Sequence, residues 1–148
     1  MKMVNPLHSI PPIFYSDLRH LVTATAEKFG DKPLYDYLEN GENKTVSYRD
    51  FAAMVESFAT SLSLRGLAGG RIAVIGETHP AYLATYLATV ILGGVIIPMD
   101  KELASEQVEA FLCQAEADAV VYTASQNERF AAAAYDTLSL RTFGILMT

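Results

Sequence analysis

Residues 71–100 read RIAVIGETHPAYLATYLATVILGGVIIPMD, and this stretch decides the fold class. Its first part, Ile72 to Ile75, is an apolar run of β type that leads into a short polar turn. An apolar helix pattern follows from Pro80 to Leu92, and a second β-type run, Val95 to Ile97, ends at Pro98. Two parallel strands need a crossover connection, because a tight turn cannot return the chain to the same end of a sheet. The stretch therefore predicts a strand, a crossover helix and a parallel strand.

The segments before this unit predict a helix and a β-hairpin. Ser16 is a candidate cap for the helix, whose apolar positions keep to one face until Gly30 ends it. Leu34 to Leu38 and Thr45 to Tyr48 have strand character. The Asn40-Gly41 pair between them tolerates the positive φ angles of a tight hairpin turn.

The remaining segments alternate between helix and strand, which predicts an α/β fold with a mostly parallel sheet flanked by helices. Ser47 to Asp50 resembles a capping box before a helix with one apolar face. A later helix is expected to bury Val108, Phe111, Leu112 and Ala115, with Cys113 on the buried side. The later elements are a helix opened by Ser105, a strand from Ala119 to Tyr122, a helix from Asn127 to Tyr135 and a strand from Thr142 to Met147.

The helix pattern from Pro80 to Leu92 has no charged face. A helix that is apolar or small all round is buried on more than one side. We therefore expect it to lie between the sheet and a second layer, which could belong to a part of the protein outside this sequence. Large side chains form one stripe (Tyr82, Leu83, Tyr86, Leu87, Val90, Ile91) and small ones form the other side (Ala81, Ala84, Thr85, Ala88, Thr89).

Composition excludes several classes of function. The chain has 148 residues, enough for one domain, and its 51% hydrophobic residues are typical of a globular protein rather than a disordered one. A net charge of −6 without a Lys/Arg cluster argues against nucleic acid as a partner. Cys113 is the only cysteine, so an internal disulfide is impossible and a cytoplasmic location is expected. The longest apolar run is shorter than the roughly 20 residues of a membrane span, so no transmembrane segment is predicted.

The polar turn at Glu77, Thr78 and His79 is the first place to look for a site, because ligands of open α/β sheets bind beyond the carboxyl ends of the strands. We take these three residues as candidate substrate-binding residues. A more ordinary interpretation makes His79 a helix cap before Pro80 and leaves Glu77 solvated. Gly76 is the only glycine there, so a dinucleotide-binding loop is not expected, and the sequence contains no Walker loop or nucleophile elbow. No catalytic residue and no metal site is predicted.

Four short segments, in their order and spacing, carry a resemblance to a known family. They are LRHLVTATAEKFGDKPLYDY (18–37), TVSYRDF (45–51), LRGLAGGRIAVIG (64–76) and LGGVIIPMD (92–100). Together they resemble the N-terminal part of the adenylate-forming, AMP-binding enzymes, which include acyl-CoA synthetases, luciferases and the adenylation domains of peptide synthetases. Gly70 stands where the family more often has Asp. The run PMDKEL, residues 98–103, is similar to the long-chain fatty acyl-CoA ligases.

The resemblance implies a ligase that activates a carboxylic, notably a fatty, acid with ATP and Mg²⁺ and then transfers the acyl group to CoA. Such an enzyme needs a Ser/Thr/Gly-rich phosphate loop with a Lys, a carboxylate for the ribose and a Lys on a mobile C-terminal domain. None of these motifs occurs in this sequence. The resemblance therefore assigns no catalytic residue and no cofactor to this chain itself. It implies part of an N-terminal subdomain at 16–148, inactive alone, with the rest of the ligase packed on helix 80–92. Residues 1–15, which carry three prolines and lack periodicity, are expected to form an extended arm.

Two other classes of function compete with the ligase. A free-standing flavodoxin-like module would bind a small molecule between the loops Gly76–His79 and Asp100–Ala104. A non-catalytic interaction domain would use the apolar helix Pro80–Leu92 as a docking surface.

Overall fold

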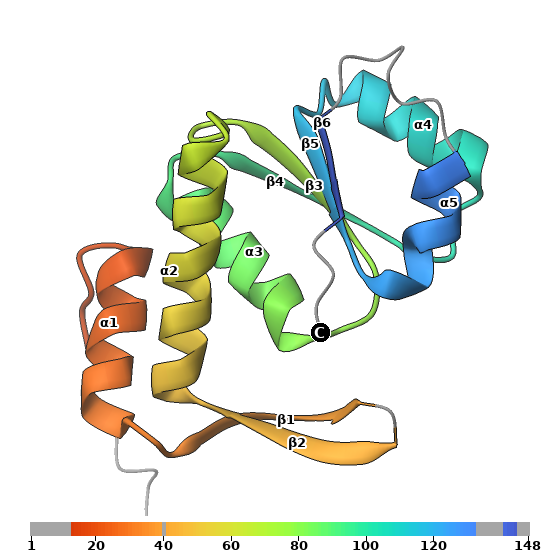
Figure 1. Ribbon diagram of the computed structural model, residues 1–148. Helices are drawn as coiled ribbons and strands as arrows, with labels where there is room; N and C mark the ends of the chain where they lie inside the picture. Colours follow the sequence, from red (N-terminus) through yellow and green to blue (C-terminus); the bar gives the residue numbers. More distant parts are fainter. Residues whose placement is uncertain (1–12, 40, 133–140, 145–148) are drawn as a thin grey trace, which may run out of the picture.

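A parallel sheet forms the middle layer of the molecule (Figure 1). The computed structural model describes residues 13–39, 41–132 and 141–144. In the described part of the chain the sheet has the order β4-β3-β5-β6, and all neighbouring strands run parallel. This confirms the predicted α/β class. The strands are β3 (Arg71–Ile75), β4 (Val95–Met99), β5 (Ala119–Tyr122) and β6 (Arg141–Gly144).

Helices cover both faces of this sheet (Figure 1). One face carries α2 (Tyr48–Leu64) and α3 (Pro80–Ile91), with α1 (Leu18–Phe29) beside α2. The other face carries α4 (Ser105–Gln114) and α5 (Asn127–Ala132), which follows the short 3₁₀ helix η1 (Ala124–Gln126). The antiparallel hairpin of β1 (Pro33–Glu39) and β2 (Glu42–Ser47) joins α1 to α2, as predicted.

The strands divide the core into two halves because successive side chains point to opposite faces. Ile72 packs with α2 and α3, whereas Ala73 and Ile75 pack with Val108 and Leu112 of α4. All five side chains are fully buried. Within the residues that the structure describes, none of the helices has the length and apolar character needed to span a bilayer.

Two helix caps differ in detail from the prediction. Asp17, not Ser16, caps α1, and its carboxylate accepts the backbone N–H of His20 at 2.7 Å. Ser16 lies one residue too early to reach that N–H. At α2, Ser47 accepts the backbone N–H of Asp50 at 3.1 Å and donates its hydroxyl to the Asp50 carboxylate at 2.7 Å. Tyr48 consequently begins α2 and does not end β2.

The unit β3-α3-β4 confirms the strand, helix and strand that its sequence predicts. β4 continues through Pro98 to Met99, beyond its predicted end. Proline is tolerated there because β4 pairs only with β3 among the described strands, so its missing N–H can face away from the ladder.

The small face of α3 is the buried one. Ala84, Thr85 and Ala88 have no exposed surface, and the Thr85 hydroxyl donates to the carbonyl of Ala81 at 2.8 Å. Small side chains let α3 approach both α2 and the sheet. On the large stripe, Leu83 and Tyr86 each keep 38% of their surface exposed. Within the described residues α3 thus packs against both α2 and the sheet, as predicted, but only its small face is fully covered.

Two predictions about α4 are wrong. Phe111 is 46% exposed, and Cys113 is exposed rather than buried. Val108 and Leu112, one turn apart, form the row that faces the sheet, whereas Phe111 and Cys113 point to either side of that row. Ser105 is the first residue of the helix, as predicted. The predicted helix residues 133–135, the strand residues 145–147 and most of the arm at 1–15 lie outside the described residues.

Candidate site at the carboxyl ends of the strands

The strand order places a topological switch point between β3 and β5. The chain leaves β3 through α3 on one face of the sheet and reaches β4 at one side of β3. It then leaves β4 through α4 on the opposite face and returns to pair with β3 on the other side. Loops that diverge at such a point open the crevice in which open α/β sheets bind ligands. The turn at residues 76–79 lies at this position.

Glu77 is the centre of a polar cluster at the switch point. Its carboxylate accepts hydrogen bonds from the hydroxyl of Thr123 at 2.5 Å and from the hydroxyl of Ser125 at 2.8 Å. The Lys101 ammonium lies 3.8 Å from the same carboxylate. Glu77 follows β3, Lys101 follows β4, and the two hydroxyl residues follow β5. The cluster therefore joins the ends of three adjacent parallel strands.

The environment of Glu77 favours its ionised form. The hydrogen bond from Thr123 is the largest cause that lowers the pKa of Glu77, and Ser125 and Lys101 act in the same direction against the opposing effect of partial burial. The side chain is 44% exposed, so it is neither fully solvated nor enclosed. Glu77 is thus a fixed anion whose hydrogen-bond partners come from the protein.

Gly76 makes this arrangement possible. Its φ is +149°, a conformation that favours glycine. A Cβ at this position would lie 2.3 Å from Oγ1 and 2.5 Å from Cγ2 of Thr123. The backbone of the turn after β3 can therefore approach Thr123 only without a side chain at residue 76.

His79 caps α3, as the more ordinary interpretation of the sequence predicts. Its Nδ1 accepts the backbone N–H of Ala81 at 3.2 Å, and its ring meets the ring of Tyr37 edge-on at 4.8 Å between centroids. Its Nε2 is buried and has no hydrogen-bond partner among the described residues, and Glu39 Oε1 lies 3.9 Å away. Desolvation lowers the pKa of His79, partly opposed by the charge of Glu39.

The three candidate residues do not form one site. Glu77 is bound to the loop after β5, His79 faces the hairpin, and Thr78 is exposed between them. The residues that gather around Glu77, namely Lys101, Thr123 and Ser125, were not among the predicted site residues. Their positions just after β4 and β5 are the signal that could have indicated them.

The polar cluster around Glu77 does not fit the phosphates of a nucleoside triphosphate. Its central group is a carboxylate, which would repel a phosphate group placed beside it. Across residues 13–39, 41–132 and 141–144, His, Cys, Asp and Glu side chains nowhere gather in threes that could hold a metal ion. We therefore derive no step of ATP chemistry from these residues.

The curated relatives are longer enzymes, and this chain matches only a part of each. Feruloyl-CoA synthase of an Amycolatopsis species is 30% identical over 90 residues, which cover 60% of this chain and 18% of that enzyme. Hispidin synthase of Neonothopanus nambi is 32% identical over 108 residues, which cover 73% of this chain and 6% of that enzyme. The chain thus spans less than a fifth of the length of these relatives.

The fold matches about a third of the N-terminal domain of a solved structure. The inhibitor-bound N-terminal domain of FACL13 from Mycobacterium tuberculosis superposes with a TM-score of 0.74 at 19% identity. The likeness covers 85% of this chain and 32% of that chain. A model of the family described as AMP-binding enzyme matches residues 22–143, which is most of the sequence. The chain therefore belongs to the family of AMP-binding enzymes.

Proposed function

We propose that this chain is the N-terminal part of an ATP-dependent acid–CoA ligase. In the complete enzyme a carboxylic acid attacks ATP, which yields an acyl-adenylate and pyrophosphate. The thiol of CoA then takes the acyl group and releases AMP. The observation that carries the proposal is the family match over residues 22–143. It favours this function over a free-standing flavodoxin-like module or an interaction domain.

We propose a fatty acid as the substrate class and CoA as the acceptor. The segment PMDKEL at 98–103, which resembles long-chain fatty acyl-CoA ligases, supports the fatty acid. The relative named feruloyl-CoA synthase supports CoA as the acceptor and makes an aromatic acid the competing substrate. The lone Cys113, which has no partner for an internal disulfide, supports a cytoplasmic enzyme.

The sequences expected to bind ATP and Mg²⁺ would lie in the rest of the ligase. The phosphate loop, the ribose-binding carboxylate and the C-terminal Lys that the resemblance implies do not occur in these 148 residues. We therefore propose that the chain alone is inactive and serves as a scaffold. Of the three candidate substrate-binding residues, Thr78 is the exposed one, whereas Glu77 and His79 already contact other parts of the chain.

The half-exposed stripe of α3 supports a scaffold role. Leu83 and Tyr86 are each 38% exposed on a helix whose opposite face is fully buried. Apolar side chains gathered on one helix face favour a covering partner. We propose that the remainder of the ligase packs on this stripe.

Exchange of radiolabelled pyrophosphate into ATP tests the proposal. The assay compares this chain with the same chain followed by its downstream coding sequence, each with hexadecanoate, octanoate and ferulate. We expect exchange only from the longer protein, with the fatty acids preferred. Exchange by the isolated chain would show that it holds a catalytic site of its own. A longer protein that is folded but inactive with all three acids would contradict the proposed ligase.

A further inference from the structure

A groove where α1, α2 and the end of α3 meet has no part in the proposed ligase chemistry. Its volume is about 290 Å³. Val55 and Ala59 are buried at its floor, with only 3% and 6% of their surfaces exposed. The lining is mostly apolar or small: Val22, Thr23, Ala26, Ala52, Ala53, Val55, Ala59 and Ile91.

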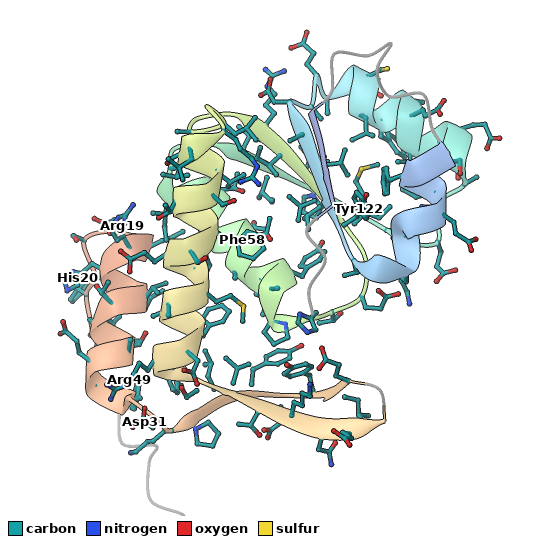
Figure 2. All side chains as sticks on the ribbon, in the orientation of Figure 1. Arg19, His20, Asp31, Arg49, Phe58 and Tyr122 are labelled. Atoms are coloured by element: carbon teal, nitrogen blue, oxygen red, sulfur yellow. The ribbon has the colours of Figure 1, made fainter. Side chains whose placement is uncertain are left out.

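Two arginines line this groove from opposite ends. Arg19 lies in the first turn of α1 and Arg49 in the first turn of α2, and the two helices run antiparallel (Figure 2). Nε of Arg49 is 2.9 Å from a carboxylate oxygen of Asp31. Arg19 forms no ion pair with the rest of the described chain. On a chain with a net charge of −6, Arg19 is thus a cation without a carboxylate partner among the described residues, beside an apolar cavity.

One further charge lines the groove. Glu56 is the carboxylate among the lining residues, and because Asp31 already pairs with Arg49, Arg19 is the lining cation without an ion pair among the described residues. One cation without an ion pair complements one negative charge on a ligand. The lining therefore favours a ligand with a single anionic group.

We propose that this groove binds a small amphiphilic monocarboxylate, with its carboxylate on Arg19 and its apolar body on the floor. The planar guanidinium matches a carboxylate in geometry and charge. Mostly apolar clefts of about 300 Å³ with a few placed polar groups are typical of small-molecule sites. A small molecule is the favoured occupant, because a volume of about 290 Å³ lies near the lower end of the range typical of small-molecule sites. The inference does not depend on the proposed ligase activity.

Methyl and amide NMR titrations of the whole chain test the site with octanoate as the probe. We expect shifts at Ala26, Ala52 and Ala59, and weaker binding by octanamide, which has the same shape without the charge. Arg19→Gln should weaken octanoate binding about 5-fold, the size expected of an exposed ion pair. The matched control is Lys28→Gln, which removes one positive charge from the same helix outside the groove and should leave binding unchanged.

A second pair of variants tests the cavity and its charge. Ala53→Leu, at an exposed position of α2, should fill the groove and abolish the shifts without unfolding the chain. Glu56→Gln should strengthen binding about 2-fold by removing the opposing charge. Absence of shifts at the groove residues, or equal losses in Arg19→Gln and Lys28→Gln, would overturn the inference. None of these measurements involves ATP, so a failure here is distinct from a failure of pyrophosphate exchange.

Discussion

Thr123 donates a hydrogen bond of 2.5 Å to the carboxylate of Glu77 and so ties the loop after β5 to the loop after β3. The two residues are 46 positions apart in the sequence. They meet because β3 and β5 are neighbouring parallel strands whose carboxyl ends lie at the same edge of the sheet. A hydrogen bond between side chains therefore joins the two loops at the switch point between these strands.

Thr123→Val should lower the free energy of unfolding by about 0.5–1.5 kcal/mol, because it removes one hydrogen-bond donor and keeps the side chain's shape. Urea denaturation measures the change. Thr60→Val, at an exposed position of α2, is the matched control and should have little effect. The same Thr123 variant should raise the pKa of Glu77 toward its ordinary value of 4.5, as measured by carboxyl ¹³C NMR. An unchanged titration would show that the hydroxyl does not hold the carboxylate in solution.

The chain should lose stability as the pH falls from 7 to 5 through the partly buried imidazole of His79. Burial lowers the pKa of His79 from its ordinary value of 6.5, so the folded state favours the neutral ring. Below the unfolded pKa the unfolded chain binds the proton more readily, and the stability that the neutral ring contributes is lost as the pH falls further. His79→Asn keeps a capping side chain without a titrating group. Its melting temperature should depend less on pH over this window, and an equal dependence would rule out His79 as the source.

Gly76→Ala should destabilise the chain by about 1–3 kcal/mol, from strain at a positive φ and from overlap with Thr123. Thr123→Ala removes the two atoms that the new methyl group would meet most closely, Oγ1 and Cγ2. The double variant should therefore be more stable than the sum of the two single losses predicts. A double-mutant cycle by thermal denaturation measures this coupling. Strict additivity would show that the turn does not approach Thr123 so closely.

Truncations along the helices should follow burial rather than residue type. Leu112→Ala should cost about 2–5 kcal/mol, because Leu112 of α4 is fully buried. The half-buried Leu87 of α3 packs against the core, so Leu87→Ala should cost less than Leu112→Ala but more than Leu83→Ala. Chemical denaturation of the three variants gives the order. A cost below about 1 kcal/mol for Leu87→Ala would show that this side chain adds little to the core.

Most of the architecture could be predicted from local patterns. The unit β3-α3-β4 and the first hairpin strand match their predicted elements within one or two residues, whereas β2 begins three residues before its predicted start at Thr45. The close matches arise because the period of apolar residues and the glycine stops are properties of neighbouring positions. The caps were less predictable. Ser16 and Asp17 are both good capping residues, and only the path of the backbone puts Asp17 within reach of the N–H of His20.

The sequence by itself determined the class of fold, the order of its elements and the resemblance to the AMP-binding family. Only the tertiary structure decided that α3 buries its small face, that Phe111 and Cys113 lie outside the core, and that Thr123 and Ser125 bind Glu77. The physical reason is the range of the interactions. Periodicity indicates which element forms, but which face is covered depends on the elements packed against it. Contacts between residues far apart in the sequence depend on the strand order, which no local pattern contains.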